Sequence, residues 1–197
     1  MNLIERNLRK ISENMALCGG ALILASAFLV TVEVFLRKLA NFSIGGADEL
    51  SGYALGIGSS WAFALTLICR ANIRVDALYA MLPDKLAAVL DVIALVVLGA
   101  VLGVSSVYIW DVLVESIEFD SHANTPLATP LWIPQGLWFI GFVAFLIVFA
   151  YQSFVSILSL LKGDFETVHK LLGARTVNDD IEDEVGAQPH PLNEKEG

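Results

Sequence analysis

Charged, histidine and cysteine residues are scarce in this sequence. Only 17% of its 197 residues are charged, whereas about one quarter is usual for a soluble domain. The two cysteines and three histidines form no cluster with the spacing of a metal site. The chain therefore has neither the composition of a soluble domain nor the ligands of a metal centre or a haem.

Four long runs contain no charged residue at all. They cover residues 14–32, 50–69, 92–110 and 131–161 and are 19, 20, 19 and 31 residues long. A helix needs about 20 residues to cross the hydrocarbon core of a membrane, and the period-two alternation of a barrel strand is absent. We predict an all-α integral membrane protein. Its four transmembrane helices are expected at about residues 14–36, 50–69, 87–110 and 134–161.

The first run could alternatively belong to a signal peptide. It is longer than the usual apolar region of a signal peptide, which has about 7 to 15 residues. The segment before it also contains two acids, Glu5 and Glu13. We therefore expect the first run to remain in the chain as a transmembrane helix.

The positive charges lie mostly on one side of the expected membrane. Ten of the twelve lysines and arginines precede the first run, separate the second from the third, or follow the fourth. Only Arg37 and Lys38 lie on the other side. Because lysine and arginine are enriched in cytoplasmic connections, we expect both termini and the middle connection to be cytoplasmic.

The two ends of the chain differ from the apolar runs. In residues 3–11, apolar side chains recur at helical spacing among charged ones. This pattern predicts a short amphipathic helix at the membrane surface, which we favour, or the first turns of the first transmembrane helix. Residues 1–163 form the expected membrane domain. Residues 164–197 hold nine acids against three bases, so we expect an acidic, disordered cytoplasmic tail.

Catalytic constellations are missing as well. No glycine-rich loop resembles a phosphate cradle, and no residues at one membrane depth offer a nucleophile, a base and an orienting group. We expect no enzyme activity, no cofactor and no nucleic-acid partner. The helix centres have few polar residues, with Gln152 as the main exception, and this argues against a self-sufficient carrier.

Charged residues gather at the expected periplasmic ends of the helices. Glu33 and Arg37 are four residues apart and can pair at the membrane boundary, an interpretation that we favour over recognition by a partner. An acidic face continues at helical spacing beyond Trp110. The candidate residues for docking a periplasmic partner are Arg37, Lys38, Asp48, Glu49, Asp111, Glu115 and Glu118.

Small residues recur in the second and third runs. Gly52, Gly56, Ser60 and Ala64 follow one another at four-residue steps, and Gly99 and Gly103 do the same. Such spacing lets helices approach closely in lipid. Prolines at 126, 130 and 134 predict an irregular or extended approach to the last helix, with Pro134 in its first turn. The candidates for structural or subunit interfaces here are Gly52, Gly56, Gly99, Gly103 and Pro134.

A polar segment, ICRANIRVDAL, follows the second run at residues 68–78. Arg70 and Arg74 fit a positive anchor at the cytoplasmic surface. Asn72 and Asp76 add no positive charge. They favour a folded turn that fixes the second helix against the third helix or against a partner subunit.

Two stretches resemble a known family. ADELSGYALGIGSSWAFALTLICRANIRVDALYAMLP and TPLATPLWIPQGLWFIGF are similar to the small permease subunit, DctQ type, of tripartite ATP-independent periplasmic (TRAP) transporters. The resemblance covers about residues 1–163. The positions that match its pattern are Glu49, Arg70, Ile73, Val75, Asp76, Leu82, Pro83, Pro130, Trp132, Pro134 and Gly141. Asn72 stands where the family usually has histidine, which puts a pH-linked role there in doubt.

The resemblance implies a multi-pass subunit of a sodium-driven symport system in the bacterial inner membrane. Such systems take up organic acids such as dicarboxylates, which a periplasmic substrate-binding protein delivers. A large, many-helix permease subunit holds the substrate and sodium sites. The small subunit is implied to be a static brace that offers part of the docking surface. A membrane scaffold protein unrelated to transport is the second alternative, and an independent small carrier is the third.

Overall fold

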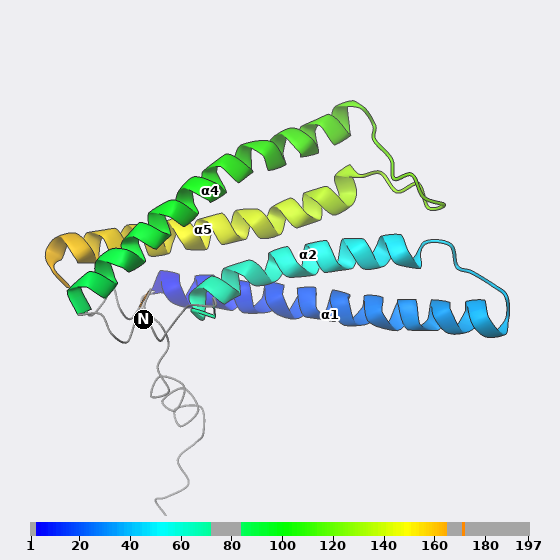
Figure 1. Ribbon diagram of the computed structural model, residues 1–197, viewed down its shortest axis with the longest axis horizontal. Coiled ribbons are helices and arrows are strands. Elements are labelled where there is room, and N and C mark those ends of the chain that lie inside the picture. The colour runs from blue at the N-terminus through cyan, green and yellow to red at the C-terminus, as the bar shows by residue number, and fades with distance from the viewer. Residues whose placement is uncertain (1–2, 72–83, 165–170, 172–197) are drawn as a thin grey trace, which may run out of the picture.

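The protein is a bundle of long helices. The computed structural model describes residues 3–71, 84–164 and 171. These residues form α1 (Leu3–Leu39), α2 (Ala47–Ile68), α4 (Asp84–Glu118) and α5 (Trp132–Lys162), which run back and forth in Figure 1. All four are long and apolar enough to cross a membrane, so the predicted all-α class with four spanning helices is confirmed.

The N-terminal residues belong to α1 and do not form the separate surface helix that we favoured. α1 is one helix of 37 residues from Leu3 to Leu39, or roughly 55 Å at 1.5 Å per residue. No proline or glycine interrupts it before Gly19. Arg9 and Glu13 pair at 2.9 Å just before the expected start of the transmembrane helix, and an ion pair at this spacing supports helix there.

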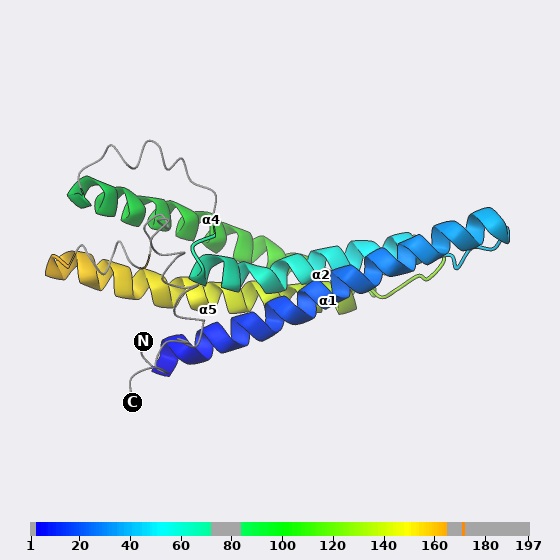
Figure 2. The ribbon, with the colours of Figure 1, turned by 90° about the horizontal axis from the view of Figure 1, so that it is seen from below.

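α2 and α5 form the centre of the bundle. α2 packs between α1 and α5, and α4 packs against the other side of α5, an order that Figures 1 and 2 show from two directions. Ala64, Leu67 and Val148 are buried where α2 meets α5. α4 therefore reaches the rest of the bundle mainly through α5.

The helices cross closely where both partners are small. A Cβ on Gly19 of α1 would lie 2.7 Å from the backbone oxygen of Gly58 in α2, and a Cβ on Gly58 would lie equally close to the oxygen of Gly19. A Cβ on Gly141 of α5 would lie 2.6 Å from Cδ1 of Trp61 in α2. Since packing holds helices together in lipid, these two crossings set the positions of α1, α2 and α5.

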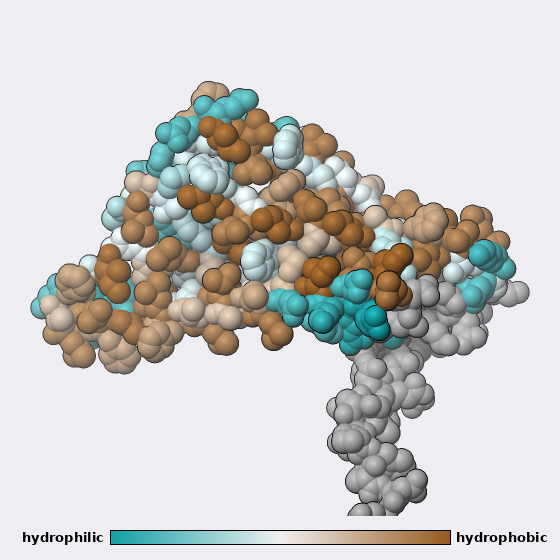
Figure 3. Space-filling model, turned by 180° about the vertical axis from the view of Figure 1, so that it is seen from behind, coloured by the Kyte–Doolittle hydropathy of each residue, from teal (hydrophilic) through white to brown (hydrophobic). Residues whose placement is uncertain are grey.

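The bundle has two distinct ends. We call the end with the connections 40–46 and 119–131 the loop end, and the end with Leu3 and Lys162 the terminal end. In Figure 3 hydrophilic residues gather in separate patches, at the left of the view and beside the grey atoms, with largely apolar surface between them. This distribution is the one expected of a protein whose middle faces hydrocarbon and whose ends face water.

Each described helix is followed by a residue with a left-handed backbone. These residues are Asn41, Arg70, Asp120 and Gly163, with φ values of 50°, 52°, 45° and 73°. After α2, the amide of Arg70 bonds to the carbonyl of Leu67, and the amide of Ala71 bonds to that of Thr66. This is the Schellman pattern, which satisfies the last carbonyls of a helix.

Candidate docking and subunit interfaces

Glu33 organises the connection between α1 and α2. Its side chain lies near the end of α1 and is only 4% exposed. One carboxylate oxygen accepts a hydrogen bond from the hydroxyl of Ser43 at 2.6 Å, and the other accepts one from the amide of Ile44 at 2.8 Å. The amide of Gly45 donates in turn to the Ser43 hydroxyl at 3.2 Å. The carboxylate of Glu33 thus holds the turn by hydrogen bonds, and Arg37 still interacts with it electrostatically.

Glu49 makes a second link at the loop end. It lies in the first turn of α2, where its carboxylate suits the positive end of the helix dipole. One oxygen accepts a hydrogen bond from the phenol of Tyr53 at 2.8 Å, and the other accepts one from the hydroxyl of Thr125. Glu49 therefore ties the start of α2 to the connection between α4 and α5.

That connection is folded back on itself. His122 and Pro130 form an antiparallel bridge, and the amide of Ala123 donates to the carbonyl of Thr129 at 2.9 Å. We predicted an irregular or extended approach here, and the segment is a short hairpin-like loop. Its tip lies beside the α1–α2 connection in Figures 1 and 2.

Leu127 packs the hairpin-like loop against the start of α2. A Cβ on Gly46, the residue that precedes α2, would overlap the side chain of Leu127. Pro126 of the same loop lies over Gly45. Together with the Glu49–Thr125 bond, this contact joins the two connections. We call residues 43–49 and 121–131 the loop-end platform.

Three further docking candidates lie in or next to this platform. Arg37, Lys38 and Asp48 are exposed. A pocket of about 210 Å³ between the two connections is lined by Glu33, Arg37, Asp48 and Glu49, among others. The structure thus brings three of the seven candidates, Arg37, Asp48 and Glu49, together in one hollow.

The acidic face of α4 lies on a separate element. α4 continues to Glu118, as the helical spacing beyond Trp110 predicted. Asp111, Glu115 and Glu118 are exposed in its last turns. Their role in docking stays a prediction.

Three interface candidates line one groove on the side of the bundle. Gly52 and Gly56 of α2 face Pro134 and Trp138 of α5 across a groove of about 300 Å³. A Cβ on either glycine would meet nothing within 4 Å. Pro134 is buried in the first turn of α5, as predicted. This groove leaves space at the backbone of α2 for another chain.

The four-residue stripe on α2 does not stay on one face. Ser60 and Ala64 are fully buried against neighbouring helices, whereas Gly52 and Gly56 are exposed. A step of four residues advances about 400° on a helix of 3.6 residues per turn, so the stripe rotates about 40° at each step. On α4, Gly99 faces the ring of Phe149 in α5, and a Cβ on Gly103 would meet nothing within 4 Å.

The polar segment after α2 is described only at its start. Arg70 takes the left-handed position that ends α2. The proposed turn residues Asn72, Arg74 and Asp76 lie outside the described residues, so their roles stay predictions.

The sequence reasoning missed the residues at the tightest crossings. Gly19 and Gly58 were not singled out, and Gly141 was noted only as a family position. A further contact between helices is the indole N–H of Trp61, which donates to the carbonyl of Leu137 at 2.9 Å. The signal available was the pair of glycine-rich segments CGG and GIG, but a sequence does not show which segments face each other.

The described residues define a helical membrane protein whose hydrogen-bonded carboxylates and folded connections lie at the ends of the helices. Among them no three His, Cys, Asp or Glu side chains form a metal-binding group. A model of the family "Tripartite ATP-independent periplasmic transporters, DctQ component" matches residues 26–160. The chain therefore belongs to the DctQ family, and the resemblance seen in its motifs is confirmed. No curated protein and no solved structure matches it significantly.

Membership assigns the chain a general role. The DctQ component is the small membrane subunit of a TRAP transporter, and the family works with a large permease and a substrate-binding protein. The family is one of transporter subunits.

Proposed function

We propose that this chain is the small membrane subunit of a sodium-driven, binding-protein-dependent TRAP transporter that takes up organic acids. It braces the large permease subunit and forms part of the surface on which the binding protein docks. It lies in the bacterial inner membrane with both termini in the cytoplasm. Family membership carries the assignment to TRAP transport, and the loop-end platform is the observation that supports docking.

The orientation rests on the positive charges. The terminal end carries Arg6, Arg9, Lys10, Arg70, Lys85 and Lys162 among the described residues, and the loop end carries Arg37 and Lys38. Because the end richer in lysine and arginine stays in the cytoplasm, the loop-end platform faces the periplasm. There it is accessible to a soluble binding protein.

A docking role requires a surface of defined shape. Loops between helices are usually the most mobile part of a membrane protein. Here Glu33 accepts two hydrogen bonds from one connection, and Glu49 links the other to α2. A preformed surface loses less conformational entropy when a partner binds. The exposed charges around the platform then steer and orient the encounter.

A bracing role requires open faces that fit another membrane helix. The groove at Gly52, Gly56 and Pro134 gives an incoming helix access to the α2 backbone. Small residues with four-residue spacing are typical of such contacts. We propose this groove as a contact for the large permease subunit.

Charge reversal tests the docking role. Glu118→Lys should weaken binding of the periplasmic protein, because an exposed charge steers association without holding the fold. It should leave co-purification of the large subunit unchanged. The matched control is Glu13→Lys, which reverses an exposed acid at the terminal end. Equal binding of the periplasmic protein to wild type and to single and combined reversals of Asp111, Glu115 and Glu118 would refute docking on this face.

A further inference from the structure

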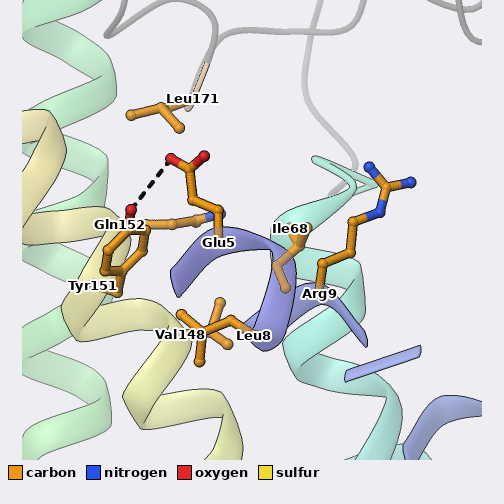
Figure 4. Close-up of a pocket in the computed structure, with 8 residues that line it drawn as sticks. All are labelled: Glu5, Leu8, Arg9, Ile68, Val148, Tyr151, Gln152 and Leu171. Carbon is orange, nitrogen blue, oxygen red and sulfur yellow. Dashed lines mark hydrogen bonds between the residues drawn. The ribbon is translucent and has the colours of Figure 1, made fainter. Parts of the chain in front are cut away.

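A pocket at the terminal end plays no part in the proposed docking or bracing. It measures about 160 Å³ and lies between α1, α2 and α5. Its apolar wall includes Leu8, Ile68, Val148 and Leu171. Its polar wall includes Glu5 and Gln152, which Figure 4 shows on the same side of the pocket as Tyr151.

Gln152 provides a buried acceptor in this pocket. Its side chain is 6% exposed, and no described group donates a hydrogen bond to its amide oxygen. A buried acceptor without a donor is costly, and native structures rarely keep one. Since Gln152 lines the pocket, a ligand in the pocket can supply the missing donor.

Glu5 provides a second acceptor beside it. The phenol of Tyr151 donates to one carboxylate oxygen of Glu5 at 3.2 Å and so positions this group from α5. A carboxylate and an amide oxygen on one wall fit a ligand that is cationic and has several N–H donors. A primary ammonium has three such donors and a positive charge.

Arg9 provides a positive charge one turn further along α1. It lines the same pocket, and in Figure 4 it lies on the far side of Ile68 from Glu5. Its partner Glu13 forms an exposed ion pair with it. Such pairs contribute little to stability, so the guanidinium can also contact a phosphate, for which its geometry is well suited. The pocket thus presents a negative and a positive group on its two sides, with apolar side chains between them.

The position of the pocket favours a lipid over a soluble ligand. It opens between three helices that are long and apolar enough to span a membrane, near the end where charged residues meet water. Its volume is about 160 Å³. That space is sufficient for a small headgroup and insufficient for a whole lipid, whose acyl chains would lie along the apolar surface of the helices.

We propose that this pocket binds the headgroup of phosphatidylethanolamine. The ammonium group lies between Glu5 and Gln152, and the phosphate lies toward Arg9. Phosphatidylcholine carries the same charges, but its quaternary ammonium has no N–H to donate. Phosphatidylglycerol has the phosphate and no cation. A bound headgroup would also connect α1 to α5, which make little direct contact with each other.

Lipid titration of the full-length chain tests this site without any measurement of transport. The chain is purified in detergent, stripped of lipid and titrated with phosphatidylethanolamine or phosphatidylcholine of identical acyl chains. Bound lipids are counted by native mass spectrometry. We expect phosphatidylethanolamine to bind about tenfold more tightly, the ratio expected for one hydrogen bond to a charged group. Equal binding of the two lipids, or tighter binding of phosphatidylglycerol, would overturn the proposal.

Two glutamines of α5 provide a matched pair of variants. Gln152→Leu should abolish the preference for phosphatidylethanolamine. Gln135→Leu should keep it, because Gln135 also has a buried amide oxygen without a described donor but lies in the groove near Pro134. Glu5→Gln is the second test variant in case Gln152→Leu does not fold, as judged by circular dichroism. A preference that survives Gln152→Leu or Glu5→Gln in folded protein would contradict the assignment.

Two further experiments distinguish a lipid from a soluble ligand or a subunit contact. Soluble phosphoethanolamine at millimolar concentration should not displace the lipid, because it lacks the acyl chains that contact the helices. The preference should also persist when the large permease subunit is co-purified. Displacement by phosphoethanolamine would indicate a soluble ligand, and loss of the preference in the complex would indicate that the pocket is a subunit contact. Either result would refute a lipid site.

Discussion

Glu49 accepts a hydrogen bond from Thr125, a residue that lies 76 positions further along the chain. This bond joins the first turn of α2 to the loop that precedes α5. We had selected Glu49 as an exposed residue for contact with a partner. In the structure it is half-buried and holds the shape of the surface on which that partner would dock.

Removing the Thr125 hydroxyl should loosen the loop-end platform. We expect Thr125→Val to destabilise the loop locally, because it removes a hydrogen bond to a charged group. Amides of residues 121–131 should exchange with deuterium faster, and the binding protein should bind more weakly. Thr31→Val is the control, since the Thr31 hydroxyl only donates to a carbonyl of its own helix. Unchanged exchange in Thr125→Val would show that the bond does not hold the loop.

Glu33 should matter more for stability than an exposed glutamate of the same helix. Glu33→Gln leaves the amide of Ile44 or the hydroxyl of Ser43 without a carboxylate acceptor, at a cost of about 1.5–3 kcal/mol. Glu13→Gln should cost at most about 1 kcal/mol, because its pair with Arg9 is exposed. Thermal unfolding in detergent compares the two variants. Equal melting temperatures would argue against a structural role of Glu33.

The glycines of α2 should separate into two functional groups. Gly58→Ala should destabilise the isolated chain by about 1–3 kcal/mol, because its Cβ would overlap the backbone of α1. Gly56→Leu should leave the isolated chain stable and reduce the yield of complex with the large permease. Thermal unfolding and co-purification measure the two effects. A Gly56→Leu chain that assembles normally would exclude the groove as a subunit contact.

Variants of Arg70 can separate its role as the residue that ends α2 from its role as a positive charge. It takes a left-handed conformation, which costs a residue other than glycine about 1–2 kcal/mol. Arg70→Gly should therefore raise the melting temperature, whereas Arg70→Ala should not. If the positive charge of Arg70 matters more than its backbone conformation, Arg70→Gly and Arg70→Ala should lower the melting temperature to a similar extent. Arg70→Lys, which keeps the charge, should leave it unchanged.

The sequence predicted those features that depend on composition and local spacing. Four apolar runs gave the four helices, and the spacing of Asp111, Glu115 and Glu118 predicted the extension of α4 beyond Trp110. Pro134 was correctly placed in the first turn of α5. These features follow from the length and period of a helix, which are properties of the local chain.

Features that depend on which segments meet could not be predicted in this way. Glu33 was expected to pair with Arg37 because four-residue spacing is visible in a sequence. Its bonds to Ser43 and Ile44 depend on the path of a turn. Glu49 and Thr125 are brought together only by the packing of α2 beside α5. The pairing of Gly19 with Gly58 depends on the crossing of two helices whose sequences carry several small residues.

Reconstituted uptake tests the central claim most directly. The chain would be co-purified with the large permease subunit of its transporter and inserted into vesicles, with the binding protein and a labelled organic acid outside. We predict uptake that requires an inward sodium gradient, the binding protein, the large subunit and this chain together. Failure of the two subunits to co-purify, or equal uptake by vesicles that lack this chain, would contradict the proposed function.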